Sequence, residues 1–194
     1  ELSRDDCLIS PAQKPGFVAE SDGGMTVVID TNLPAESIAW LADNCHAPIF
    51  ADPVSTVKAE KLRPVLGKLH TLKPNRLEAE LLSGVPITGT DSLHRAAQTL
   101  LATGLHRVFI SLGADGVYAA DQSGSVTLPA PKAEMVSTTG CGDSFMAALT
   151  WAYLQGSDLE RSARAGLAAS SLTMESAETI HPSMSEAELL WRMA

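Results

Sequence analysis

From Met25 onward the chain alternates short apolar runs, most of which lead into a polar residue, with stretches of helical periodicity. The first run, Thr26 to Ile29, is β-branched and ends at Asp30, which is typical of a buried parallel strand. Strands that alternate with helices form a parallel sheet covered by helices on both faces, so the pattern predicts an α/β fold. The predicted strands are residues 26–29, 48–51, 69–72 and 107–110, followed by a hairpin of 117–120 and 125–128.

Helices are expected between these strands and after the hairpin. Pro34 opens the first of them, because a proline at an early helical position loses no hydrogen bond. Pro64 kinks or divides the second, and Asp91 caps a helix that Gly104 ends. Two predicted helices begin at Pro34 and at Ser185. The others span residues 58–69, 76–83, 92–102, 144–154 and 158–174.

The start of the chain has a different character. Residues 1–24 mix charges with Pro11, Pro15 and a glycine pair, and they keep neither a helical nor a strand period. The sequence therefore predicts an irregular N-terminal segment, residues 1–24, ahead of one α/β domain, residues 25–194.

Charge and hydropathy exclude several classes of function. Lys and Arg number 14 against 23 Asp and Glu, a formal charge of −9, and no cationic cluster offers a surface for duplex nucleic acid. The most apolar stretch, Phe145 to Leu154, is interrupted by Thr150 and is too short to span a bilayer. The first residues lack the apolar core of a signal peptide, so we expect a cytoplasmic protein that does not bind membranes. Neither a disulfide framework nor a structural zinc site follows from Cys7, Cys45 and Cys141.

The sharpest local feature is Thr138 to Phe145, in which Gly140, Cys141, Gly142 and Asp143 precede an apolar helix. Glycines let the backbone approach a ligand closely, and the first N–H groups of the helix point at the same place. This arrangement can stabilise a phosphoryl group during transfer, while a carboxylate at its mouth can accept a proton from an attacking hydroxyl. Taken alone, the tetrapeptide also fits a plain turn with Asp143 as a helix cap, and Cys141 fits either a thiolate nucleophile or a small loop residue.

A second feature lies at a predicted strand-to-helix junction, in Lys73 to Glu80. Asn75 and Glu78 are three residues apart, so they share one helical turn. An amide and a carboxylate placed there could hold a hydrated magnesium ion and a phosphate oxygen. The alternative is a capping box in which Asn75 caps the helix and Glu78 completes the pair.

The third feature follows the strand that ends at Ile110. The residues Ser111, Gly113, Ala114, Asp115 and Gly116 are small or turn-forming, so backbone and hydroxyl groups there could meet the phosphates of a nucleotide. Open α/β sheets bind ligands at this carboxyl edge. The alternative is an ordinary Asp-Gly turn. The dinucleotide fingerprint Gly-x-Gly-x-x-Gly and the P-loop pattern are both absent from the sequence.

In this order and at these strand ends, the three motifs resemble those of the ribokinase-like (PfkB) carbohydrate kinase family. The resemblance implies a Rossmann-like, mostly parallel sheet with helices on both faces, and an ATP- and magnesium-dependent phosphotransferase. In that family the aspartate at the Asp143 position is the catalytic base, and the loop at Gly140, Cys141 and Gly142 forms the anion hole. The Asn75 and Glu78 positions are linked to phosphate and magnesium, and the segment from Ser111 to Gly116 holds the nucleotide.

Two runs of residues narrow the class of phosphate acceptor that the resemblance implies. Phe50 to Ser55 with Lys58, and Leu69 to Gly84, resemble one nucleoside kinase of the family, which transfers the ATP γ-phosphate to a nucleoside 5′-hydroxyl. Another sugar or nucleoside kinase of the same family, and a non-catalytic nucleotide-binding module derived from one, remain alternatives. The lids of family members often pair, so a homodimer is a further expectation.

The resemblance has two departures and a limited extent. Ser137 stands where many members carry an aspartate associated with a monovalent-cation site, so potassium activation is not implied, and Cys141 replaces the usual alanine. The similarity covers roughly Met25 to Pro182, the C-terminal part of the family. The first strands, the Gly-Gly substrate loop and the β-lid are not recognisable, so we expect a nucleotide-binding portion that is inactive alone.

Overall fold

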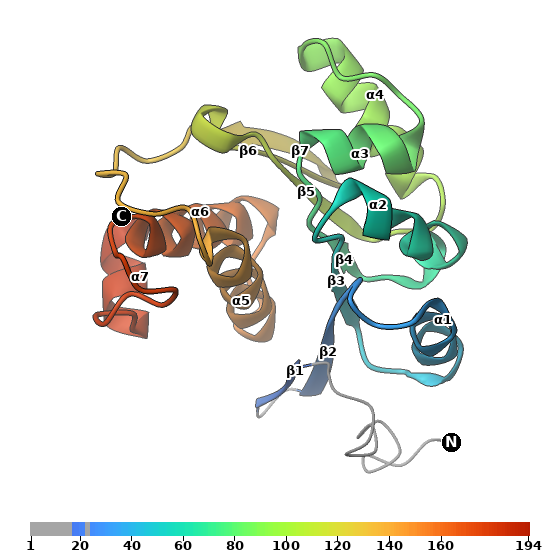
Figure 1. Ribbon diagram of the computed structural model, residues 1–194, viewed down its shortest axis with the longest axis horizontal. Helices are drawn as coiled ribbons and strands as arrows, with labels where there is room; N and C mark the ends of the chain where they lie inside the picture. Colours follow the sequence, from blue (N-terminus) through green and yellow to red (C-terminus); the bar gives the residue numbers. More distant parts are fainter. Residues whose placement is uncertain (1–16, 22–23) are drawn as a thin grey trace. The chain divides into compact units, whose positions relative to one another are not determined.

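The computed structural model describes residues 17–21 and 24–194 (Figure 1). Its sheet has seven strands in chain order, with β1 antiparallel to β2 and β2 to β5 parallel to one another. This confirms the predicted α/β class and the mostly parallel sheet. The strands are β1 Phe17–Ser21, β2 Gly24–Asp30, β3 Ile49–Asp52, β4 Thr71–Leu72, β5 Arg107–Ser111, β6 Val117–Asp121 and β7 Gly124–Leu128.

The chain forms two compact units. Unit 1 reaches to Ser111 and also contains Ala120–Gly124, while unit 2 consists of Leu112–Ala119 and Ser125–Ala194. The sequence predicted one domain over residues 25–194, because periodicity reports individual elements and not how contacts divide among them.

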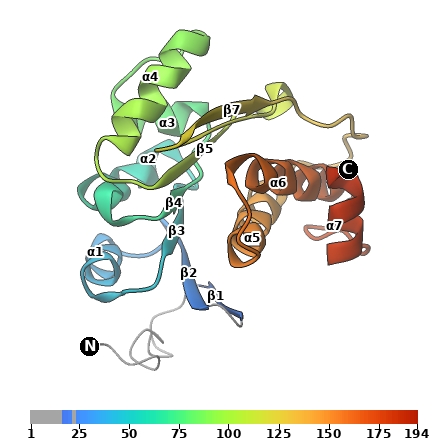
Figure 2. The ribbon, with the colours of Figure 1, turned by 180° about the vertical axis from the view of Figure 1, so that it is seen from behind.

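In unit 1 the helices that connect the parallel strands lie together on one face of the sheet (Figures 1 and 2). They are α1 Ala35–Asn44, α2 Thr56–Ala59, the 3₁₀ helix η1 Glu60–Lys68, α3 Arg76–Ser83 and α4 Thr90–Leu101. Their apolar faces and the strands form a dry core that includes Ile38, Leu41, Phe50, Leu62 and Leu72. This core fixes the strand ends on which the candidate residues lie.

Unit 2 is built around the close packing of two helices, α5 Cys141–Leu154 and α6 Leu159–Met174, with α7 Glu186–Met193 against α6. Small residues make this possible: an added Cβ on Gly166 would lie 2.4 Å from the Phe145 ring. Ala148 and Ala152 of α5 share a buried cluster with alanines of α6. Among the described residues no helix has both the length and the apolar character that a membrane span requires.

Several element boundaries differ from the sequence-based prediction. The second helix is a short α2 followed by η1, and the 3₁₀ geometry accommodates Pro64. Asp91 is not the cap of α4. The hydroxyl of Ser92 accepts the N–H groups of Thr88 and Gly89, at 2.8 and 3.0 Å, so the helix begins earlier.

The N-terminal segment also differs in part from the expectation of irregular chain. Phe17–Ser21 pairs with β2, from Phe17 opposite Val28 to Ser21 opposite Gly24. Gly24 is the first residue of β2, and the rest of that predicted segment, residues 1–16 and 22–23, lies outside the described part.

Three aromatic rings stack in unit 1 where β3, β4 and β5 begin. His70 lies between Phe50, at a centroid distance of 5.3 Å, and His106, at 5.4 Å. Its Nδ1 is 2.9 Å from the Thr71 hydroxyl. Burial lowers the pKa of His70 to about 4, and the positive charge of Arg107 and the nearby His106 act in the same direction. The ring is therefore neutral in the folded protein near neutral pH.

This stack predicts acid sensitivity of the fold. Because the pKa of His70 is about 4 in the folded state and near 6.5 in the unfolded chain, the unfolded state binds the proton more readily. The free energy of unfolding should fall as the pH drops from 6.5 to 4, by about 1–2 kcal/mol after screening of the partly exposed ring. Denaturant titrations should show a flatter pH dependence for His70→Phe, which keeps the stack. The exposed His94→Gln should behave as wild type, and equal slopes for His70→Phe and wild type would contradict the assignment.

Candidate active site

Polar side chains occupy the carboxyl ends of four neighbouring parallel strands in unit 1. Asp30 ends β2 and pairs in register with Asp52, which ends β3. Asn75 follows β4 and forms an isolated parallel bridge with Ser111, the last residue of β5. The structure therefore brings the predicted residues Asn75 and Ser111 together at the sheet edge where open α/β folds bind ligands.

Asn75 and Glu78 form a complete capping box at the start of α3. The Asn75 Oδ1 accepts the N–H of Glu78 at 2.9 Å, and the Glu78 Oε2 accepts the N–H of Asn75 at 2.9 Å. This confirms the capping box that the sequence offered as an alternative to a magnesium and phosphate site. Glu78 is nevertheless buried, with 3% of its surface exposed, which is unusual for a residue that only caps a helix.

A buried ion pair lies beside this box. The Lys73 Nζ is 2.8 Å from the Asp52 Oδ2, with 8% and 16% of the two side chains exposed. Burial raises the pKa of the Glu78 carboxyl above its ordinary value, and the charge of Asp52 adds to this, whereas the Asn75 N–H and Lys73 oppose it. Two carboxylates thus share one ammonium group in a poorly hydrated place.

Asp52 and Lys73 were not among the candidate site residues. The signal was present in the sequence, since Asp52 ends an apolar strand and Lys73 follows the next one. The pairing became visible only with the parallel register of β3 and β4, in which Ala51 lies opposite Leu72.

The loops that follow β2 and β3 are tied together by side chains. The Asp30 carboxylate accepts the N–H and the Nδ2 of Asn32 at 2.7 and 2.8 Å, and the Lys58 Nζ donates to the Asn32 Oδ1 at 2.5 Å. The Thr31 hydroxyl donates to the Pro53 carbonyl oxygen. The Lys61 Nζ donates to carbonyl oxygens of the same β2–α1 loop. These bonds hold the carboxyl ends of β2 and β3 in one arrangement.

Val54 lies in this loop region with an uncommon backbone conformation. Its φ is +61°, in the left-handed region that β-branched residues avoid. The N–H of Ser55 donates to the Pro53 carbonyl at 2.6 Å, which closes a γ-turn around Val54, and the N–H of Val54 donates to the Asp52 Oδ1 at 3.1 Å. The surrounding hydrogen bonds therefore hold a strained residue at the end of β3.

The donors at this edge fit a magnesium ion. Magnesium takes oxygen ligands, and it usually combines one or two carboxylates with water and substrate phosphates. Glu78 supplies a buried carboxylate and Asn75 an amide oxygen, and a cation there would favour the ionised form of Glu78, whose pKa burial raises. Within the described residues no group of three or more His, Cys, Asp or Glu side chains could hold a metal ion. Water and phosphate oxygens would complete the shell.

The third motif turns immediately after β5. Gly113–Asp115 forms a single 3₁₀ turn, which the N–H of Leu112 closes by donating to the Gly116 carbonyl at 2.8 Å. Gly116 has a φ of +97°, and a Cβ there would lie 2.0 Å from the Leu128 carbonyl oxygen. A glycine is therefore required at this position. Ala114 and Asp115, like Gly113, are exposed in the turn.

The Gly140–Asp143 loop lies in unit 2 at the start of α5. Gly140 is the residue before the helix, with a φ of +84°, and a Cβ there would lie 2.3 Å from the Thr179 carbonyl oxygen. Helix α5 begins at Cys141, three residues earlier than the sequence predicted. The N–H groups of Gly142 and Asp143 are consequently first-turn groups, which have no acceptor within a helix.

Asp143 does not cap α5. Its side chain is exposed in the first turn, and among the described residues the carboxylate has no hydrogen-bond or ion-pair partner. This contradicts the alternative in which Asp143 serves as a helix cap. The carboxylate lies at the N-terminal end of a 14-residue helix and is open to a group that approaches from solvent.

Cys141 is half-buried between the loop and α6. Burial raises the pKa of its thiol above the ordinary value, although a hydrogen bond with Ser170 opposes this. The Sγ lies 3.9 Å from the Ser137 carbonyl oxygen. A raised pKa disfavours the thiolate that a nucleophilic cysteine requires.

The predicted site residues are thus divided between the units, with Asn75, Glu78 and Ser111 in unit 1 and the two glycine-containing loops in unit 2.

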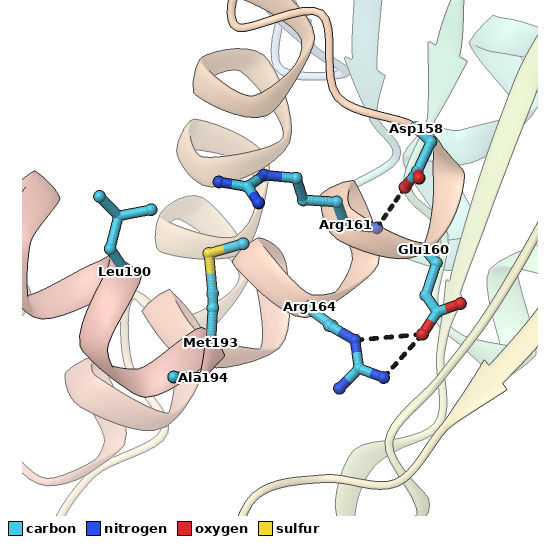
Figure 3. A pocket seen from close by; sticks show the side chains of 7 residues that line it. All are labelled: Asp158, Glu160, Arg161, Arg164, Leu190, Met193 and Ala194. Atoms are coloured by element: carbon cyan, nitrogen blue, oxygen red, sulfur yellow. Dashed lines mark hydrogen bonds and ion pairs between the residues drawn. The ribbon is translucent and has the colours of Figure 1, made fainter.

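Three surface hollows are lined by residues other than these. Figure 3 shows one of about 440 Å³ between α6 and α7, where Arg161 extends toward Leu190 and Met193 while Arg164 binds Glu160. The other two lie at the start of α4 and beside α3, and none of the three is lined by a predicted site residue.

Comparison with known proteins agrees with these motifs. The model of the pfkB family carbohydrate kinases matches residues 29–187. The pseudouridine kinase of Escherichia coli is 39% identical over 166 residues, which cover 84% of this chain and 53% of that enzyme. An uncharacterized sugar kinase of the same organism, YeiI, is 35% identical over 82% of this chain and 44% of its own length. The chain therefore spans about half the length of these relatives.

A solved structure gives the same result. The crystal structure of a putative sugar kinase from Clostridium perfringens superposes with a TM-score of 0.83 and 35% sequence identity, over 87% of this chain and 54% of that one. The family model covers well over half of the sequence and includes all three motifs. The chain therefore belongs to the pfkB family of carbohydrate kinases.

Proposed function

We propose that this chain carries the nucleotide-binding and catalytic-base part of an ATP-dependent kinase that phosphorylates pseudouridine at its 5′-hydroxyl. The observation that carries the proposal is the Asp143 carboxylate. It is exposed in the first turn of α5 beside a glycine loop, and it makes no capping hydrogen bond to the helix. The acceptor is inferred from the 39% identity with pseudouridine kinase. It rests also on the runs Phe50–Ser55 and Leu69–Gly84, which resemble that enzyme.

In the proposed reaction the 5′-oxygen of the acceptor attacks the γ-phosphorus of ATP. The Asp143 carboxylate accepts the hydroxyl proton, the bond between the γ-phosphorus and the β–γ bridging oxygen breaks, and ADP leaves. The backbone N–H groups around Gly140, Cys141 and Gly142 stabilise the charge on the transferred phosphoryl oxygens. These N–H groups are available because Gly140, in its left-handed conformation, lets α5 begin at Cys141.

The remaining motifs bind the nucleotide in this proposal. Glu78 and Asn75 hold magnesium and a phosphate oxygen, and the ion neutralises phosphate charge when it is bound. Ser111, Gly113, Ala114, Asp115 and Gly116 contact the nucleotide through backbone and small polar groups. Ser137 supplies no carboxylate for a monovalent cation, so potassium is not part of the proposal.

A second acceptor class has its own support. The similarity to the sugar kinase YeiI, at 35% identity, favours a kinase of the same family that acts on a different sugar or nucleoside. Both candidates use the same base and loop, so they differ only in the acceptor.

The test is magnesium-ATP-dependent release of ADP by this chain, with pseudouridine, uridine, ribose or no acceptor in parallel. Release that requires pseudouridine supports the proposal, and release with ribose alone favours the second class. If no acceptor gives release while calorimetry still detects ATP binding, the chain is a nucleotide half-site. Absence of both would contradict the proposed function.

A further inference from the structure

The loop of Gly140–Asp143 is fixed by the last turn of α6, and this observation carries an inference that rests on the proposed function. The Ser144 hydroxyl, just after the loop, lies 2.6 Å from the Thr173 hydroxyl. Thr173 is fully buried, at 0% exposure, and Ser144 is half-buried. The pair holds a defined geometry, because the buried Thr173 hydroxyl has no water to replace Ser144 as its partner.

The neighbouring residue of α6 holds the other end of the loop. The carbonyl oxygen of Met174 accepts the N–H of Val136 at 2.9 Å and the N–H of Ser137 at 3.1 Å. Consecutive residues, Thr173 and Met174, therefore bind the chain directly after the phosphoryl-binding segment, at Ser144, and three residues before it, at Ser137.

The contacts between the helices follow helical spacing on both sides. Gly166, Ser170 and Thr173 recur at intervals of four and three residues, so they lie on one face of α6. They meet Phe145, Cys141 and Ser144 respectively, which share the first turns of α5. The end of α6 is anchored in turn, because Glu175 pairs with Arg192 of α7 at 2.7 Å.

We propose that Thr173 is a positioning residue, which sets the direction of the first turn of α5 and thereby of the Asp143 carboxylate and the loop N–H groups. Thr173 touches no substrate in this proposal and acts through Ser144. Displacement of a catalytic group by about 1 Å can cost about 100-fold in rate. Loss of the Thr173 hydroxyl should therefore reduce the rate of transfer far more than the affinity for ATP.

The test compares Thr173→Val with Thr173→Ser and with Thr150→Val. Valine keeps the shape of threonine without its hydroxyl, while serine keeps the hydroxyl. Thr150 is a matched control, because it is buried on α5 and its hydroxyl donates to the Met146 carbonyl of the same helix, at 3.0 Å.

We expect Thr173→Val to lower kcat by about 10- to 100-fold with KM for ATP within about twofold, and Thr173→Ser to restore most of the rate. Thr150→Val should stay near wild type. Combining Thr173→Val with Ser144→Ala should add little to the single changes, since both remove the same contact. Equal kcat for Thr173→Val and Thr150→Val would overturn the inference, while leaving the proposed function intact.

Amide hydrogen exchange tests the same inference if the wild-type chain gives no turnover. Thr173→Val should speed exchange of the Ser144 amide, which donates to the Gly140 carbonyl at 2.9 Å, by about tenfold or more, and it should leave the middle of α5 unchanged. Thr150→Val should not affect the loop. Loop exchange equal to that of wild type would overturn the inference without reference to any activity.

Discussion

Asp143→Asn is expected to reduce phosphoryl transfer by about 10²- to 10⁴-fold, the usual contribution of a general base. The amide has nearly the shape of the carboxylate but cannot accept the proton of the attacking hydroxyl. The side chain has no partner among the described residues, so its replacement breaks no contact there. Fold stability and ATP affinity should both stay close to wild type, the affinity within about twofold. The measurements are ADP release for the rate and calorimetry for ATP binding.

Asp91→Asn is the matched control, because Asp91 is also an exposed carboxylate in the first turn of a helix, α4. It should leave transfer unchanged. A rate loss for Asp143→Asn below about tenfold would remove Asp143 from the role of base. A parallel loss of ATP binding would show instead that the carboxylate organises the nucleotide site.

The second large effect is expected on stability. Lys73→Met should lower the free energy of unfolding by about 3–5 kcal/mol, because it leaves the carboxylate of Asp52 in a poorly hydrated place without its ammonium partner. Glu78 also loses a nearby positive charge, so the two carboxylates repel each other. The loss should be smaller at pH 5 than at pH 8, since burial raises the pKa of Glu78 and protonation of this carboxyl relieves the repulsion. Denaturant titration at both pH values measures it.

Lys68→Met is the control, because it removes a lysine from an ion pair with Asp43 that is half exposed on both sides. Exposed pairs contribute at most about 1 kcal/mol, so the loss should be small. The double variant Lys73→Met with Asp52→Asn should recover part of the stability, since no unpaired charge remains at Asp52. If Lys73→Met costs no more than Lys68→Met, the burial of the pair does not have the energetic weight assigned to it.

Strands β2, β3 and β5 were predictable because each contains an apolar run that β-branched or aromatic residues dominate. Ile49–Asp52 and Arg107–Ser111 lie within one residue of their predicted positions, and the hairpin of β6 and β7 follows its turn signal. Strand β4 is shorter than predicted, with only Thr71 and Leu72 in the ladder. His70 stacks between two rings instead, a contact with distant residues that no local pattern reveals.

The site was predictable as a set of motifs but not as a geometry. The capping box of Asn75 and Glu78 follows from their spacing of three residues. The start of α5 at Cys141 depends on Gly140 lying against the Thr179 backbone, which is a tertiary contact. The pairing of Asp52 with Lys73 likewise needs the register of two strands that are separated by a helical connection. Local sequence patterns identify such residues as candidates, and only the tertiary structure shows which of them are in contact.

The γ-turn at Val54 has a thermodynamic consequence. A non-glycine residue in the left-handed region costs about 1–2 kcal/mol, and the exposed Val54 side chain offsets little of it by burial. The bonds from Asp52, Pro53 and Thr31 supply that free energy during folding, before any ligand arrives. A molecule that binds at the end of β3 would therefore meet a loop that is already ordered. Its affinity would not be lowered by the entropy cost of ordering that loop.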